Sequence, residues 1–595
     1  MKRIRTQQVL SPLRNLLVTA LLSLSLGLPL YAQKVPSVES TIRYLASDEL
    51  GGRKAGERGD SLSAIFIRDA FVSAGLELLF DKGWQSFSLV NSVELGPLNH
   101  FMVRNESFAA EVDFLPYSFS ASKNLKAPLV FAGYGFDIRT DDLEWDDYRG
   151  LEVEGKWVMM LKGEPDLDKT DSRFADYSGE RAKVLTAQDK GAGGVILVGG
   201  SKFSEQDVLQ KLFYDKNSST YSIPVVQITR KLADLLLSTD SINGLEQKLN
   251  SDRAPHSFLA AAEVHASVDV IQKTAETHNV AAILHGSDPL LRSEYVVIGA
   301  HYDHLGLGGP GSGSRSPDTI AIHYGADDNA SGVAAMLAMA EKAAREKSNR
   351  RSLIFAAFGA EEMGLIGATA FTANSPVPLK DIRAMINFDM VGRLNDDHPA
   401  LSIGGTQTSL ETEEMLERLN PGFALSLSGE GYGPSDHAAF YMHDIPVFFV
   451  STGAHPDYHT PEDTPDKINF VGINRVADYL WSVASEVANR EGPLTFQEAG
   501  ARSRRNQSTR MRVTLGVMPD FAGQERNGMR IDAVTKGRPA ELAGMLKGDI
   551  ITAINGNPVG NIYDYMNRLN GLEVGQTISI DVLREGEPRI LIVQL

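Results

Sequence analysis

E-Y-V-V-I-G-A-H, residues 294–301, is a short apolar run, rich in β-branched side chains, that ends in a histidine. Similar runs at 352–358, 382–388 and 445–450 are each followed by acidic groups or a histidine. Runs of this length and composition are typical of buried parallel strands. Ligands of open α/β sheets bind beyond the carboxyl ends of the strands, so we expect these four ends to meet in one crevice. The predicted fold class of this region is α/β, with a mixed, largely parallel sheet flanked by helices.

The groups that follow these runs are imidazoles and carboxylates, in the segments H-Y-D-H, G-A-D-D-N-A-S-G, G-A-E-E-M-G, N-F-D-M and D-Y-H-T-P-E-D. A single such residue after a strand is usually a cap or a loop residue, but that explanation would have to hold separately at every position. Imidazole and carboxylate suit zinc, and the sequence contains no cysteine, which excludes a thiolate site. The carboxylates exceed what one tetrahedral zinc needs, which favours two ions about 3.5–4 Å apart that share a carboxylate.

The motifs G-A-H-Y-D-H-L-G, G-A-D-D-N-A-S-G-V-A-A-M-L, F-A-A-F-G-A-E-E-M-G, N-F-D-M-V-G-R, G-P-S-D-H-A-A-F and Y-H-T-P-E-D-T resemble, in the same order, those of the co-catalytic di-zinc aminopeptidase family. Relatives of that family include glutamate carboxypeptidase and glutaminyl cyclase. The resemblance implies a zinc exopeptidase fold with two Zn²⁺ ions per chain. It makes His301 and Asp389 ligands of one ion, makes Glu362 and His459 ligands of the other, and makes Asp328 the bridge.

The resemblance also assigns catalytic roles. Glu361 matches the general base, and Asp303 matches an acid that hydrogen-bonds a ligand imidazole and so fixes its tautomer. The neighbours Glu361 and Glu362 cannot point the same way from an extended segment, which agrees with one binding metal while the other accepts a proton. Tyr458, next to His459, is either a donor to the oxyanion of the tetrahedral intermediate or a packed loop residue.

Other polar residues near the motifs are not expected to bind metal. Asp327 is the acid of A-D-D-N that does not match the bridging position. We expect His304 to be a hydrogen-bonded structural residue, because isolated histidines usually are. Asp436, in G-P-S-D-H, best suits a role behind the ligands or in the wall of the substrate site.

The N-terminus has the features of a signal peptide. The cationic residues Lys2, Arg3, Arg5 and Arg14 precede an apolar run at 16–30, and Y-A precedes residue 33. We therefore expect export to the periplasm or the exterior of a bacterial cell. No later apolar stretch reaches the length of a membrane span. The formal net charge of −18 argues against nucleic acid as a partner.

Two further segments resemble known modules. F-A-G-Y-G, V-E-G-K-W-V-M-M and K-G-A-G-G-V-I-L resemble a β-rich protease-associated (PA) domain, which would be either a lid over the site or a spacer. The C-terminal segment resembles a β-rich PDZ domain, whose groove would capture a peptide C-terminus at L-G-V-M, or stay empty. The predicted divisions are a signal peptide (1–32), an N-terminal part of the peptidase domain (34–125), the PA insertion (126–245), the catalytic domain (260–490), a linker (491–512) and the PDZ domain (513–595).

The sequence thus predicts an exported zinc aminopeptidase acting on peptides with a free N-terminus. Two alternatives stay open at this point. One is a carboxypeptidase or dipeptidase of the same fold, and the other is a non-catalytic peptide-binding protein. The arginines that a terminal carboxylate would need cannot be assigned from the sequence.

Overall fold

A computed structural model describes residues 34–499, except 141, 170–171, 217–218 and 239, and residues 515–595, except 520–527, 535–537, 561–563, 566–567, 570–571 and 573–574. The predicted signal peptide and most of the predicted linker lie outside the described residues. Within these ranges, no helix is long and apolar enough to cross a membrane.

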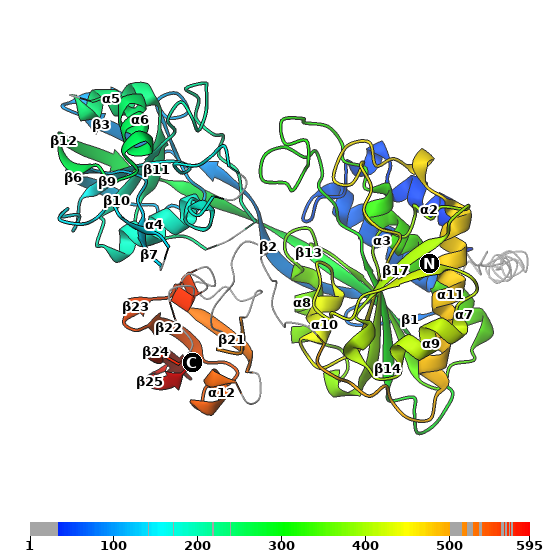
Figure 1. The fold of residues 1–595 in the computed structure, drawn as a ribbon. Coiled ribbons are helices and arrows are strands. Elements are labelled where there is room, and N and C mark those ends of the chain that lie inside the picture. The colour runs from blue at the N-terminus through cyan, green and yellow to red at the C-terminus, as the bar shows by residue number, and fades with distance from the viewer. Residues whose placement is uncertain are drawn as a thin grey trace, which may run out of the picture.

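The larger body is built on a mixed sheet with the strand order β1-β13-β15-β14-β16-β19-β17-β18. Its four central strands, β15, β14, β16 and β19, are all parallel, and the outer pairings β13–β15 and β17–β19 are antiparallel (Figure 1). The strands are β1 (Glu77–Leu78), β13 (Val270–Leu284), β14 (Tyr295–His301), β15 (Ser352–Phe358), β16 (Ile382–Phe388), β17 (Ala400–Gly404), β18 (Ala424–Leu427) and β19 (Val447–Ser451). The predicted α/β class with a mixed sheet is confirmed.

Helices cover both faces of this sheet because each central strand buries side chains on both sides. On β14, Val296 and Ile298 face one apolar cluster, whereas Val297 faces another. The first cluster holds the helices α2 (Val38–Leu45), α3 (Arg58–Ala74), α7 (Gly332–Glu346), α9 (Thr412–Leu419) and α11 (Phe470–Asn489); the second holds α8 (Ile366–Ala373) and α10 (His437–Tyr441).

A buried arginine ties the N-terminal segment to the edge of the sheet where the strands end. Arg53 is fully buried and donates to the carbonyl oxygens of Leu45, Tyr302, Tyr324 and Gly325 at 2.5–3.0 Å. Burial lowers its pKa to about 10, so the guanidinium stays charged at neutral pH. This cation therefore fixes the loop that directly follows His301 and the turn before α7 that carries Asp328.

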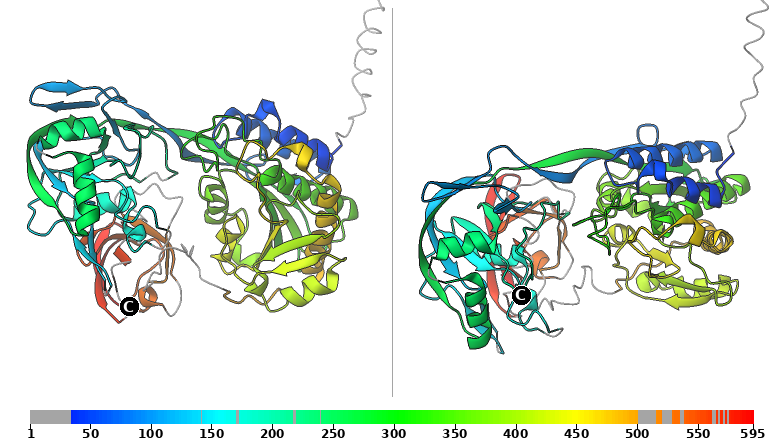
Figure 2. Two further views of the ribbon diagram at one scale, coloured as in Figure 1. Left: turned by 45° about the horizontal axis from the view of Figure 1, so that its top comes forward. Right: turned by 90° about the horizontal axis from the view of Figure 1, so that it is seen from above.

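The second body is an eight-stranded sheet with the order β4-β3-β12-β6-β9-β10-β11-β5. Its strands are β3 (His100–Val103), β4 (Glu106–Phe108), β5 (Phe114–Pro116), β6 (Asn124–Ala132), β9 (Trp157–Leu161), β10 (Gly194–Val198), β11 (Val225–Ile228) and β12 (Ser257–Ser267), with the hairpin β7 (Asp137–Arg139)–β8 (Glu144–Asp146) and the helices α4 (Glu180–Asp189), α5 (Arg230–Leu237) and α6 (Ile242–Asp252). This sheet extends beyond the predicted bounds 126–245 at both ends, because β12 pairs with both β3 and β6. A long ribbon of β2 (Trp84–Leu95) and β13 leads from the larger body to this one (Figures 1 and 2).

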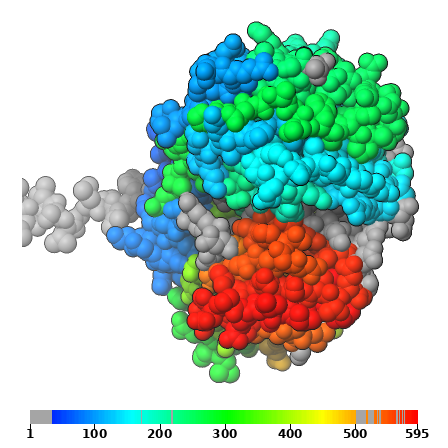
Figure 3. Space-filling view, turned by 90° about the vertical axis from the view of Figure 1, so that its left-hand side faces the viewer, coloured from blue at the N-terminus to red at the C-terminus, as the bar shows by residue number. Residues whose placement is uncertain are grey.

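The C-terminal part forms a small separate sheet with the order β20-β21-β22-β24-β25. Its elements are β20 (Val517–Pro519), β21 (Met529–Val534), α12 (Pro539–Leu542), β22 (Ile550–Ile554), β23 (Asn557–Pro558), β24 (Thr577–Arg584) and β25 (Glu587–Gln594), around an apolar core of their own. Figure 3 shows this module against the second body, and an ion pair of Arg568 with Asp189 of α4 joins the two.

Candidate metal centre

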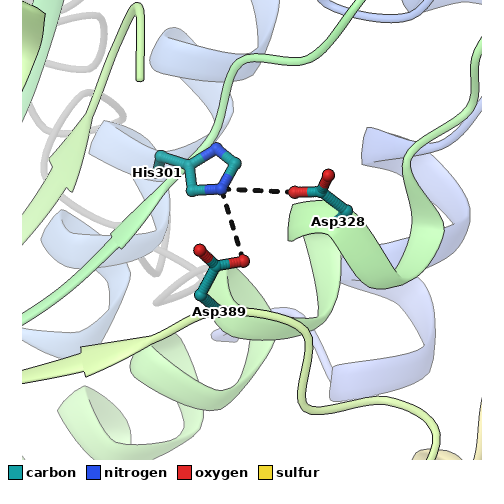
Figure 4. Close-up of side chains that lie close together, drawn as sticks. All are labelled: His301, Asp328 and Asp389. Atoms are coloured by element: carbon teal, nitrogen blue, oxygen red, sulfur yellow. Dashed lines mark ion pairs between the residues drawn. The ribbon is translucent and has the colours of Figure 1, made fainter. Parts of the chain in front are cut away.

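The predicted ligands meet at the carboxyl end of the central strands. His301 is the last residue of β14, and Asp389 comes directly after β16. Glu362 lies in the turn after β15, Asp328 lies in the turn before α7, and His459 lies in the loop after β19. Figure 4 shows His301, Asp328 and Asp389 pointing toward one another. The side chains that follow these strand ends therefore meet at one place, as the sequence predicted.

The first group of ligand atoms lies at Nε2 of His301, whose ring is almost fully buried. Its Nε2 lies 3.3 Å from Oδ1 of Asp328 and 3.5 Å from Oδ1 of Asp389. Zinc with bonds of about 2.0–2.1 Å in a tetrahedral site holds its ligand atoms about 3.3 Å apart. The three side chains fit a metal ion.

The second group lies on the other oxygen of the same carboxylate. Asp328 Oδ2 is 3.0 Å from Nε2 of His459, and that nitrogen is 3.1 Å from Oε1 of Glu362. His459 Nδ1 donates to the carbonyl oxygen of Gly313 at 2.9 Å, so its Nε2 is free to bind a metal. Asp328 therefore directs one oxygen into each group, as a bridging carboxylate does.

His304 belongs to the second group, although the sequence analysis set it aside. Its Nδ1 lies 3.0 Å from Oε1 of Glu362 and 3.8 Å from Oδ2 of Asp328. The side chain is fully buried, and neither ring nitrogen has a hydrogen-bond partner among the described residues. The sequence analysis did not expect this position among the candidate ligand atoms. The signal was present in H-Y-D-H, a second histidine three residues after the first.

Glu361 lies beside the first group without being part of it. Its Oε2 is 3.9 Å from Nε2 of His301, and burial raises its pKa well above the usual value. The two neighbours thus diverge, since Glu362 joins the second group. Asp436, a fully buried acid whose oxygens have no hydrogen-bond partner within the described chain, lies near Glu361, and burial raises its pKa to about 8.

Asp303 acts on the backbone of the glutamate pair. Its carboxylate accepts hydrogen bonds from the backbone N–H of Glu361 at 2.9 Å and of Glu362 at 3.3 Å. The predicted hydrogen bond to the ligand imidazole is not formed, because Asp303 Oδ1 is 3.9 Å from Nδ1 of His301 and that nitrogen lies nearer the backbone oxygen of Asp303, at 3.3 Å. Burial raises the pKa of Asp303 to about 7. Asp303 is therefore a positioning residue for Glu361 and Glu362.

Tyr458 and Asp327 lie at the edges of the centre. The Tyr458 ring stacks on the His459 ring, with centroids 3.8 Å apart. Asp327 turns away from both groups, since its Oδ1 accepts from the Gly392 N–H at 2.6 Å and its Oδ2 lies 3.2 Å from Nε2 of His455. Asp327 is thus not a member of either ligand group, as expected.

A segment of the second body reaches the rim of the centre. Lys216 Nζ donates to the backbone oxygen of Glu362 at 2.6 Å, and Tyr214 packs against the apolar cluster that contains Ala360 and Met363. A Cβ placed at Gly313 would lie 3.0 Å from Lys216 Nζ and 3.7 Å from His459 Nδ1. The second body therefore supplies part of the wall beside the second group.

Comparison with known proteins gives matches for all three bodies. Residues 279–484 match the model of peptidase family M28, residues 125–236 match the PA domain and residues 511–595 match the PDZ domain. An aminopeptidase of Pseudomonas aeruginosa is 26% identical over 451 residues, which cover 73% of this chain and 73% of the relative. Aminopeptidase YwaD of Bacillus subtilis is 24% identical over 473 residues, which cover 77% of this chain and 86% of the relative. A solved aminopeptidase from Aneurinibacillus sp. strain AM-1 has 24% sequence identity and a TM-score of 0.48, and the match covers 77% of this chain and 95% of that one.

The peptidase match contains every residue of the two ligand groups as well as Glu361. The PA match lies within the second body and the PDZ match covers the C-terminal module, which confirms the predicted combination of domains. Residues 279–484 form a peptidase family M28 domain, and the protein is a metallo-exopeptidase that also carries a PA domain and a PDZ domain.

Proposed function

We propose that this protein is a zinc aminopeptidase that holds two Zn²⁺ ions per chain and uses Glu361 as its general base. The observation that carries the proposal is the position of Asp328, whose two oxygens each face a separate group of ligand atoms. All side chains of the two groups are carboxylates or imidazoles. Four of them, His301, His304, Asp328 and Glu362, have less than one tenth of their surface exposed. Burying the carboxylates there is costly unless cations compensate their charge.

Zinc at these two positions would supply Lewis acidity, which polarises a scissile carbonyl and makes water a stronger acid. Glu361 is the acceptor for the proton of the attacking water, because its carboxylate lies next to the first group without being part of it. The same carboxyl then passes the proton to the leaving amine. Asp303 holds the backbone of Glu361 and Glu362, so that the two side chains keep their separate directions.

The surroundings of the site favour a free amino terminus over a terminal carboxylate. The buried groups near Glu361 include Asp389 and Asp436, whose oxygens can accept hydrogen bonds from an ammonium group. Arg393, the arginine behind the second group, is already paired with Asp457 and Asp463. The relatives named as aminopeptidases support the same choice.

The test is a matched substrate panel with purified enzyme. Aminoacyl anilides and free peptides report on aminopeptidase activity, and N-blocked peptides with a free C-terminus report on carboxypeptidase activity. The proposal expects turnover of the first set only, loss with a chelator and recovery with zinc. Turnover of N-blocked peptides would contradict it.

Lys216 supports a dipeptidase as a second candidate. Its ammonium stands at the rim beside the second group, where it would meet the carboxylate of a short substrate. A dipeptidase would cleave free dipeptides much faster than aminoacyl anilides, which lack that carboxylate. An aminopeptidase of broad specificity would cleave both kinds of substrate.

We further propose roles for the accessory parts. The PA domain supplies a wall that restricts access, which the contact of Lys216 with Glu362 supports. The PDZ domain captures a peptide C-terminus by strand addition, because β20 lies at the end of the described sheet and follows Leu515 and Gly516 directly. The signal-like residues 1–32 support export to the periplasm or beyond.

A further inference from the structure

The two ligand groups differ in the number of side chains that converge on them. His301, Asp328 and Asp389 form the first group. The second contains Asp328, Glu362 and His459, and the His304 ring lies against these as well. This asymmetry has a chemical consequence, because metal sites closed by four protein ligands are usually structural, whereas sites with three ligands keep a position for water or substrate.

The His304 ring has the environment of a metal ligand rather than of a packing residue. It is fully buried, and its two nitrogens lack hydrogen-bond partners within the described chain. An unsatisfied buried polar group costs about 1–3 kcal/mol, so a folded protein normally pairs it or gives it a metal. Nδ1 and Glu362 Oε1 approach to 3.0 Å, and both lie close to Asp328 Oδ2.

The distances around this space form most of a tetrahedron. His304 Nδ1 is 3.0 Å from Glu362 Oε1 and 3.8 Å from Asp328 Oδ2, and His459 Nε2 is 3.1 Å and 3.0 Å from the same two oxygens. Their mean is close to the separation of about 3.3 Å expected between zinc ligands. The His304 and His459 rings face each other edge to face, with centroids 5.7 Å apart, as two imidazoles on one ion can.

The surrounding backbone keeps the His304 ring in place. A Cβ at Gly325 would lie 2.6 Å from both Cγ and Cδ2 of the ring, so that only glycine leaves room for it there. The backbone N–H of His304 donates to the carbonyl oxygen of Arg53, whose guanidinium in turn holds the Gly325 carbonyl. Gly325 and Arg53 therefore both help to hold the His304 ring in place.

We propose that His304 Nδ1 is a fourth protein ligand of the ion held by Asp328, Glu362 and His459. This inference rests on the proposed zinc centre. The two sites would then be unequal: four side chains would close the second and bind its ion tightly, whereas three side chains would hold the first ion and leave a position for water or substrate. Asp328 and Glu362 would be held in place through the second site.

The test compares His304→Ala with His323→Ala. His323 is an equally buried imidazole near the site, but its nitrogens contact Ser314 Oγ at 2.8 Å and the Ala321 carbonyl oxygen at 3.0 Å. Zinc affinity of each apoprotein is measured by competition with a chromophoric chelator, without any assay of turnover. Wild type and His323→Ala should show one tight and one weaker site. His304→Ala should lose the tight site, with its dissociation constant raised at least about 100-fold, since even residues behind the ligands change affinity by about 10–100-fold.

Equal zinc affinities in wild type and His304→Ala would overturn the proposal. A second measurement needs no variant and covers the case in which His304→Ala fails to fold. Anomalous scattering from crystals of the zinc-loaded wild type gives the Nδ1–zinc distance directly, with about 2.0–2.1 Å expected and more than about 3 Å refuting the assignment. Failure of wild type to bind zinc at all would instead refute the proposed function, so the two outcomes are distinguishable.

Discussion

The exchange of Glu361 or Glu362 for glutamine should separate chemistry from metal binding. Both substitutions keep the size of the side chain and remove one negative charge. Glu362 Oε1 lies 3.1 Å from Nε2 of His459 and 3.0 Å from Nδ1 of His304, inside the second ligand group. Glu361 Oε2 lies 3.9 Å from Nε2 of His301 and outside both groups. Glu361→Gln should therefore keep its zinc, and Glu362→Gln should lose part of it.

The size of the kinetic effect follows from the role of the carboxyl. Removal of a general base typically costs about 10²–10⁴-fold in rate, which corresponds to about 3–5 kcal/mol in the activation free energy. Because substrate binding does not need this proton transfer, Glu361→Gln should lower kcat and leave KM nearly unchanged. Glu362→Gln should show low turnover that excess zinc partly restores.

Two assays on the same preparations check this prediction: elemental analysis of zinc after gel filtration and steady-state kinetics on an aminoacyl anilide. Glu39→Gln, an exposed glutamate on α2, is the matched control and should behave as wild type. Full activity in Glu361→Gln would refute its role as base. Loss of zinc from Glu361→Gln, with zinc retained in Glu362→Gln, would show that the two roles are exchanged.

Three other changes test the supports of the site. Arg53→Met removes a buried charge and leaves four carbonyl groups unpaired, so it should lower the free energy of unfolding of the larger body in urea by about 3–5 kcal/mol. Arg58→Met, at an exposed position, should cost less than about 0.5 kcal/mol, and equal effects would contradict the account. Lys216→Met should raise KM for free dipeptides about tenfold and leave KM for aminoacyl anilides unchanged, whereas Lys211→Met, at an exposed position, should change neither. An equal change on both substrates would leave Lys216 only a packing role. Removal of residues 513–595 should leave anilide hydrolysis nearly intact and slow the cleavage of long peptides, because the module has its own core; loss of both activities in a folded truncation would make it part of the catalytic structure.

The central strands were predictable because their sequence pattern is local. Residues 352–358 and 382–388 are largely apolar runs, and the strands β15 and β16 occupy these same residues. Their polar ends then had to meet, since parallel strands finish at one edge. The same argument placed His301 and Asp389 together without knowledge of any loop.

The features that escaped prediction depend on contacts between distant segments. His304 reaches the second ligand group because its backbone pairs with residues 53 and 54, far away in the sequence. The partners of Asp303 depend on the turn at Ala360, where a positive φ of 57° redirects the chain before the glutamate pair. The second sheet begins before residue 126 because β3 pairs with β12, more than 150 residues later. Periodicity within a segment carries no information on such pairings.

The ratio of bound zinc to protein at full activity tests the central claim most directly. Metal-free enzyme is titrated with zinc, and bound zinc and aminoacyl anilide turnover are measured at each step. The shared carboxylate of Asp328 predicts two ions per chain. Turnover should rise mainly after one ion per chain is bound, when the weaker site fills. Full activity at one ion per chain, with no further change as more zinc binds, would contradict the two-metal account.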